Sequence, residues 1–154
     1  MKVVNEVTPS DPNQLLEMTK PGPDGPVFMV NLLKFKDKAE YADGRATDLS
    51  GREAYQIYGT GVTALLPQFG GQIFFMAEVT WLQLGQVEDL WDEVAIAVYP
   101  NREALLKMSS SQEWRDLAVH REAGLAGQLN IESVMPEPLK ALPWIDLLLK
   151  DIEA

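Results

Sequence analysis

Apolar residues gather in four stretches with the character of β-strands. Residues 27–35 are apolar on both faces, which is typical of a strand buried on two sides. Residues 73–82 and 91–99 are rich in β-branched and aromatic side chains, and the short loop around Gly85 predicts that they pair antiparallel. Residues 125–134 supply a fourth strand.

Helical spacing of apolar residues fills the intervals between these strands. The predicted helices cover residues 50–69, 101–108 and 110–121. Their caps are Ser50, Asn101 and Ser110, and each serine is followed three residues later by a glutamate, which makes a capping box. Glycines after the first and third of these helices mark where they stop.

The chain divides into three parts. These are an N-terminal helix and linker at residues 1–26, the main domain at 27–134, and a C-terminal helical arm at 135–154. Asp11 before Pro12 predicts the start of the short N-terminal helix, and the Pro/Gly segment 21–26 separates it from the domain. In the arm, residues 142–149 predict a last helix, which either packs on this protein or docks on another.

The order of these elements defines the fold class. Strand, helix, strand, strand, helix pair, strand is the split β-α-β arrangement of an α+β, ferredoxin-like sandwich with a four-stranded antiparallel sheet. Helices cover one face of such a sheet, yet the strands are apolar on both sides. The pattern therefore predicts a homodimer whose sheets meet face to face, a dimeric α+β barrel.

Composition narrows the partners and the chemistry. A chain of 154 residues suits one domain, and the net charge of -10 argues against nucleic acid and anionic membrane surfaces. The absence of cysteine excludes disulfides and thiolate chemistry on this chain, and a single histidine makes a bound transition metal unexpected. We therefore expect no tightly bound cofactor and no metal.

The chain shows no secretory pattern of a basic region followed by a continuous apolar stretch. It also contains no run of about 18 apolar residues, the length needed to span a bilayer. A cytoplasmic protein without a membrane partner is the expectation.

Several short motifs, taken in order, resemble one known family. The motifs are Val30-Asn31-Leu32-Leu33-Lys34-Phe35, Tyr55-Gln56-Ile57-Tyr58-Gly59, Gly70-Gly71, Trp91-Asp92-Glu93-Val94, Tyr99-Pro100-Asn101 and Arg121-Glu122-Ala123-Gly124-Leu125. Together they are similar to the domain of unknown function 1330 family. The resemblance spans residues 27–134 and implies a dimeric α+β barrel, a superfamily that includes small cofactor-independent monooxygenases, isomerases and stress-response proteins. It raises the expectation of a small-molecule site between sheet and helices.

Three polar residues are the candidates for catalysis. Asn31 interrupts an apolar strand, so its amide either fixes register through a neighbouring loop or contacts a ligand. Tyr58 lies on the sheet-facing side of its helix, where a phenol either packs in the core or donates a proton. Arg121 shares a helix face with Trp114, where it either forms a salt bridge or holds a carboxylate or enolate oxygen.

Aromatic residues near these positions are the candidates for a pocket wall. They are Tyr55, Trp91, Tyr99 and Trp114. Glu78 and Glu93 lie in the two paired strands, where either one is a base with a raised pKa or a residue of the hydrated sheet edge. His120, the only histidine, lies on the flank of its helix, and we expect it to be exposed.

Two functions fit these features. The first is a small-molecule enzyme without a tightly bound cofactor, an isomerase, cyclase, lyase or cofactor-independent monooxygenase that acts on a small apolar or aromatic carbonyl or carboxylate compound. The alternative is a non-catalytic binding or stress-response module that captures a hydrophobic metabolite. No catalytic motif in the sequence decides between them.

Overall fold

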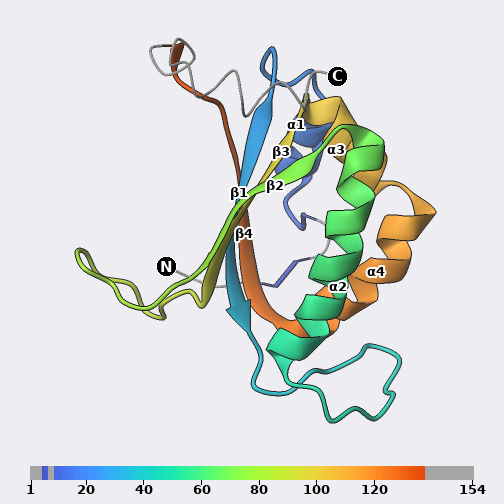
Figure 1. Ribbon diagram of the computed structural model, residues 1–154, viewed down its shortest axis with the longest axis vertical. Coiled ribbons are helices and arrows are strands. Elements are labelled where there is room, and N and C mark those ends of the chain that lie inside the picture. The colour runs from blue at the N-terminus through green and yellow to red at the C-terminus, as the bar shows by residue number, and fades with distance from the viewer. Residues whose placement is uncertain (1–4, 7–8, 138–154) are drawn as a thin grey trace.

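A four-stranded antiparallel sheet with helices packed on one face organises the chain, as Figure 1 shows for this computed structural model. The structure describes residues 5–6 and 9–137, so the predicted helix at 142–149 lies outside it. The elements are α1 (Pro12–Met18), β1 (Val27–Phe35), α2 (Gly51–Leu65), the 3-10 helix η1 (Leu66–Phe69), β2 (Gln72–Glu78), β3 (Glu93–Tyr99), α3 (Arg102–Ser109), α4 (Gln112–Gly124) and β4 (Leu125–Ser133).

The sheet confirms the predicted fold class. Its strand order is β2-β3-β1-β4, and β1 lies antiparallel to both β3 and β4. This order, with α2 after β1 and the α3–α4 pair after β3, is the ferredoxin-like α+β topology. Within the described part of the chain, no helix is long and apolar enough to cross a membrane.

The main hydrophobic core lies between the sheet and the helices. Val27 of β1 and Tyr99 of β3 are paired in the sheet and contribute to this core, with Leu66 of η1 and Met108 of α3 packed against them. Val27 and Leu66 have no exposed surface. Because side chains alternate along a strand, every second residue of β1 and β3 faces this core.

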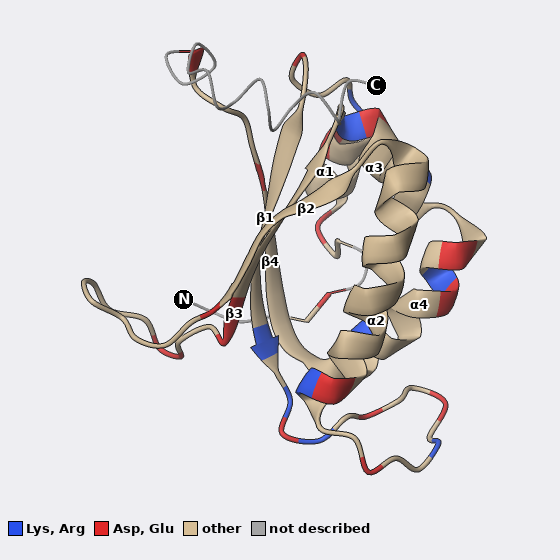
Figure 2. Cartoon of the chain, viewed as in Figure 1, with Lys and Arg blue, Asp and Glu red and all other residues tan. Residues whose placement is uncertain are grey.

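The opposite face of the sheet is also apolar. Val30 of β1 pairs with Ile96 of β3 and Ile131 of β4, and Phe75 of β2 pairs with Ile96 on its other side. Phe75 and Ile131 are 47% and 46% exposed. Figure 2 shows that the strands carry little charge over most of their length. An apolar face of this kind is what the predicted sheet-to-sheet contact requires.

Capping residues set the helix starts, and one of the three predicted caps was wrong. The Ser50–Glu53 capping box and the Asn101 cap are confirmed. At α4, however, the N-cap is Ser111, whose hydroxyl accepts the Trp114 N–H at 3.2 Å. Ser110 is instead the C-cap of α3, where its backbone N–H bonds the Leu106 carbonyl at 3.0 Å. Because Ser110 closes the last turn of α3, the next residue, Ser111, caps the first turn of α4.

This assignment predicts the effect of two neighbouring serine substitutions. Ser111→Ala should lower the free energy of unfolding by about 1 kcal/mol, because the first turn of α4 loses its cap. Ser110→Ala is the matched control and should change it by less than about 0.5 kcal/mol. Urea denaturation of both variants is the measurement, and equal effects would contradict the assignment.

The connection between β2 and β3 is longer than the sequence predicted. β2 ends at Glu78 rather than at residue 82, and β3 begins at Glu93 rather than at 91. The last pairing between the two segments is the Val79 N–H to Asp92 carbonyl bond of 3.0 Å. Beyond it the chain leaves the sheet as the extended β2–β3 loop, which projects from the body in Figure 1 and in which Trp81 is 75% exposed. The strand was predicted too long because the apolar sequence continues beyond Glu78, the last residue of β2 that pairs with β3.

Candidate functional site

Polar side chains gather on the helix-facing side of the sheet where β1 and β4 run together. In the register of the two strands, Asn31 pairs with Asn130, and Leu33 pairs with Gln128. Strand alternation places all four of these side chains on the face that α2 and α4 cover. Arg121 reaches the same place from the last turn of α4. We call Asn31, Arg121, Gln128 and Asn130 the polar cluster.

Gln128 joins two of the residues that the sequence singled out. Its side-chain oxygen accepts from Nε of Arg121 at 2.8 Å, and its Nε2 donates to Oδ1 of Asn31 at 2.9 Å and to Oδ1 of Asn130 at 2.7 Å. The Asn31 amide donates in turn to the carbonyl of Ala95 at 3.2 Å. Asn31 therefore ties β1 to β3 and also supports Gln128, and Gln128 orients Arg121.

Arg121 is the one member of the polar cluster that carries a charge. It is only 5% exposed. Its Nη2 donates to the backbone carbonyl of Glu6 at 2.8 Å, while its Nη1 is buried and has no hydrogen-bond partner among the residues that the structure describes. No carboxylate of the described residues forms an ion pair with it. A buried guanidinium with neutral partners and one free nitrogen is suited to an anion.

Aromatic rings lie beside the polar cluster. The rings of Tyr55 and Tyr58 on α2 are 5.4 Å apart, and the Tyr58 hydroxyl accepts from Nε1 of Trp114 at 3.3 Å. Burial raises the pKa of Tyr58, while the charge of Arg121 and the Trp114 bond oppose the shift. Burial likewise raises the pKa of Tyr55. Both phenols stay protonated at neutral pH, so each hydroxyl keeps a proton that it can donate.

The two remaining pocket-wall candidates are buried at different places. Tyr99 lies in the main core, where its hydroxyl is 4.0 Å from the sulfur of Met108, and burial raises its pKa. Trp91 precedes β3 and is 5% exposed, and its indole nitrogen has no hydrogen-bond partner in the described part of the chain. Their roles as substrate contacts stay predictions.

The two candidate carboxylates have different surroundings. Both contact Nη1 of Arg52, Glu93 at 3.1 Å and Glu78 at 3.3 Å. The Glu93 side chain is 12% exposed, whereas the Glu78 side chain is 72% exposed at the outer strand of the sheet. Burial raises the pKa of Glu93, and Arg52 opposes that rise. Of the two carboxylates, Glu93 is thus the one whose pKa is raised, and its role as a base stays a prediction.

The raised pKa of Glu93 predicts that the free energy of unfolding depends on pH. An acid whose pKa is higher in the folded than in the unfolded state stabilises the fold most below its unfolded value, here 4.5. That stabilisation is lost as the pH rises through the folded-state pKa. The wild type should therefore lose stability relative to Glu93→Gln between pH 4.5 and neutrality. Denaturation of both proteins across this range tests it, and parallel curves would contradict it.

His120 is not exposed, so the prediction from the sequence was wrong. It is half-buried, and its Nδ1 lies 2.7 Å from the hydroxyl of Tyr41. Tyr41 belongs to the loop before α2, which folds back onto α4 and could not be placed from periodicity. Burial and the nearby charge of Arg45 lower the pKa of His120, so the neutral imidazole is favoured.

Two surface grooves lie away from the polar cluster. One lies between α2 and α4 and is lined by Gly61, Leu65 and Leu117 among others, and the second lies on α2 around Gln56. No predicted site residue lines either groove. Among residues 5–6 and 9–137, no three histidines and carboxylates come close enough to hold a metal ion.

The structure thus brings together part of the predicted site. Asn31 and Arg121 are linked through Gln128. Tyr58 bonds Trp114 and is near enough to Arg121 for that charge to act on its pKa. Gln128 was not among the site residues predicted from the sequence. Its signal was the polar residue at every second position of β4, namely Gln128, Asn130 and Glu132, which marks one polar strand face.

Comparisons with known proteins agree with the ferredoxin-like class that the topology defines. The chain is similar to the crystal structure of the methylated RPA0582 protein, with 27% identity and a TM-score of 0.77 over 87% of this chain and 97% of that one. A crystal structure of RPA0582, a protein of unknown function from Rhodopseudomonas palustris, gives 24% identity and a TM-score of 0.74 over 86% of this chain and 100% of that one. At3g17210 from Arabidopsis thaliana shares the fold at 14% identity and a TM-score of 0.50, over 72% of this chain and 96% of that one.

No protein-family model matches the chain, and no curated protein matches it either. The resemblance to the domain of unknown function 1330 family therefore stays a prediction.

Proposed function

We propose that the chain binds a small organic anion between the sheet and the helix pair α2–α4. The observation that carries this proposal is Arg121, a buried guanidinium with a free Nη1 and no carboxylate partner among the described residues. An unpaired buried charge is costly, and a carboxylate or enolate oxygen is the partner that guanidinium geometry fits. The aromatic rings of Tyr55, Tyr58 and Trp114 favour an apolar or aromatic body for the same molecule.

The proposed chemistry is proton transfer, as in an isomerase, cyclase or lyase, or oxygenation without a bound cofactor. Arg121 would hold the anionic oxygen. Tyr58 is the proposed proton donor, because its hydroxyl accepts from Trp114 and is not seen to donate to any of the described residues. Asn31 has its amide oxygen and nitrogen both engaged by protein, which supports a positioning role.

A binding module that does no chemistry is the second candidate, and the substitution Tyr58→Phe separates it from an enzyme. In an enzyme, Tyr58→Phe should lower turnover by about 100-fold while ligand affinity changes little, because only the proton donor is removed. In a binding module the same substitution changes affinity alone. Asn31→Leu should weaken binding in both cases, since Gln128 and Arg121 lose their support.

Native mass spectrometry of the freshly purified protein is the first experiment. It should show a small acidic molecule that leaves on denaturation, and that molecule defines the ligand class. If the wild type carries no such molecule and also fails to bind simple aromatic carboxylates such as phenylacetate in calorimetry, the proposal is wrong.

The same spectrum tests the proposed homodimer. The uncovered sheet face, with Val30, Phe75 and Ile131, supports a second copy packed sheet to sheet. We expect twice the chain mass in the wild type and a shift toward the monomer in Phe75→Glu, because the buried interface then carries a charge. Trp81→Glu, in the β2–β3 loop and away from the sheet face, is the comparison variant and should stay dimeric. A monomeric wild type would contradict the dimer but leave the anion site untouched.

A further inference from the structure

The N-terminal segment contacts the guanidinium of Arg121. The backbone carbonyl of Glu6 accepts from Nη2 of Arg121 at 2.8 Å. The preceding residue, Asn5, donates through Nδ2 to the carbonyl of Leu125 at 2.7 Å, where α4 passes into β4. Because Arg121 is 5% exposed and its Nη1 is buried, an anion cannot reach Nη1 in this arrangement. One of the elements around Arg121 must move before a ligand binds.

The N-terminal segment is the element that can move. No residue of α1 is buried, and Leu15 and Leu16 are 47% and 57% exposed. By contrast, Gln128, which also bonds Arg121, belongs to β4, and β4 is paired with β1 along its length. Segments with few buried apolar contacts open at a lower free energy than core strands do. The N-terminal segment can therefore leave Arg121 while the sheet stays folded.

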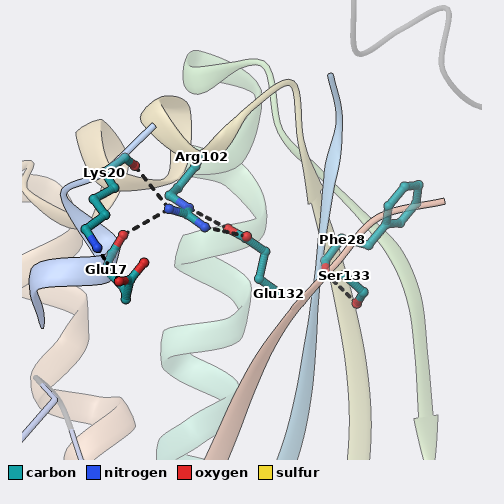
Figure 3. A network of polar contacts seen from close by, with 6 residues as sticks. All are labelled: Glu17, Lys20, Phe28, Arg102, Glu132 and Ser133. Atoms are coloured by element: carbon teal, nitrogen blue, oxygen red, sulfur yellow. Dashed lines mark hydrogen bonds and ion pairs between the residues drawn. The ribbon is translucent and has the colours of Figure 1, made fainter. Parts of the chain in front are cut away.

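Arg102 of α3 anchors the far end of the segment (Figure 3). It donates to the carbonyls of Glu17 and Lys20 at 2.9 and 3.0 Å, and it binds both carboxylate oxygens of Glu132 on β4 at 2.7 Å. A Cβ atom at Gly22 would lie 2.7 Å from that of Arg102, so the chain after α1 packs closely against this arginine. The far end is thus fixed by an ion-paired arginine, and the near end is the part that moves.

The contact at the near end leaves two buried polar atoms without partners among the described residues. They are Nη1 of Arg121 and Oδ1 of Asn5. Buried polar atoms without partners raise the free energy of the arrangement that contains them. The Glu6 carbonyl is also a neutral acceptor, whereas a carboxylate forms stronger, charge-assisted bonds with a guanidinium. A carboxylate is therefore a better partner for Arg121 than the carbonyl that it would replace.

We propose that residues 5–6 form an autoinhibitory contact, in which the Glu6 carbonyl holds Arg121 and must be displaced before the anion binds. The inference rests on the proposed anion site and concerns its regulation. The apparent affinity for the anion is lowered in proportion to the fraction of the protein in which the contact is closed. A substitution that weakens the contact without touching Arg121 therefore raises the affinity.

Calorimetry with phenylacetate tests this consequence. Asn5→Ala removes the bond to Leu125 and should strengthen binding about fivefold, the effect of one hydrogen bond on the closed state. Arg102→Met frees the far end of the segment and should also strengthen binding. Asn13→Ala is the control and should leave the affinity unchanged, because the exposed Asn13 amide bonds only Asp11.

NMR of protein labelled with nitrogen-15 follows the contact itself. The side-chain amide signal of Asn5, assigned by its loss in Asn5→Ala, should move toward the position of a free asparagine as phenylacetate is added. Its midpoint should equal that of the Arg121 Nε–H signal. If the wild type binds but Asn5→Ala binds no more tightly and the Asn5 signal stays in place, the autoinhibitory contact is overturned and the anion site stands. Failure of phenylacetate to bind any of these proteins removes the anion site and the inference together.

Discussion

Arg121→Met should weaken the binding of phenylacetate by about 100-fold, a loss typical of removing one member of a buried charge pair. Methionine keeps much of the side-chain volume but presents no donor to a carboxylate. It also leaves the Gln128 oxygen and the Glu6 carbonyl without their donor, so the free energy of unfolding should fall by about 1–3 kcal/mol. Calorimetry and urea denaturation measure the two effects separately.

Two further arginine variants make this result specific. Arg121→Lys keeps the charge but supplies a single ammonium in place of a planar fork, so affinity should lie between that of the wild type and that of Arg121→Met. Arg115→Met removes an exposed arginine of the same helix, whose contacts are Gln112 and the Ser110 carbonyl, and should leave affinity unchanged. If Arg115→Met lowers affinity as much as Arg121→Met, the ligand responds to net charge and the assigned site is wrong.

Gly51→Ala should destabilise the fold by about 3 kcal/mol or more, the upper range for overpacking. A Cβ atom at Gly51 would lie 2.2 Å from the carbonyl oxygen of Lys36 and 2.5 Å from that of Gly124. These are backbone atoms held by hydrogen bonds, so they cannot move aside: Gly51 N–H bonds Lys36, and Lys36 N–H bonds Gly124. The close crossing of three segments fixes α4, and therefore Arg121, over the sheet.

Gly59→Ala is the matched control on the same helix. A Cβ atom at Gly59 meets no atom within 4 Å, so alanine should stabilise α2 by about 0.5–1 kcal/mol. Thermal denaturation should therefore shift in opposite directions for the two variants. Similar melting temperatures for Gly51→Ala and the wild type would show that the crossing is not tight.

The fold was predictable because local signals agreed with its topology. The capping box at Ser50 and the cap at Asn101 place two helices, and continuous apolar runs place β1 and β3. The length of β2 was not predictable. The apolar residues continue from β2 to Trp81 and Leu84, and only the position of the sheet decides where pairing stops.

The site was predictable one residue at a time but not as an arrangement. Asn31 stood out as an amide in an apolar strand, yet its partner Gln128 depends on the register between β1 and β4. The contact of Glu6 with Arg121 joins residues 115 positions apart, and no local pattern encodes it. His120 was misjudged for the same reason, because its partner Tyr41 arrives from a loop without periodicity.

NMR of the arginine side chains can show whether Arg121 holds an anion in a buried site. Protein labelled with nitrogen-15 is titrated with phenylacetate, and the guanidinium Nε–H signals are followed, with assignments from Arg121→Lys and Arg115→Met. We expect the Arg121 signal to shift saturably while the signal of exposed Arg115 stays in place. An Arg121 signal that does not move while exposed arginines shift would contradict the claim.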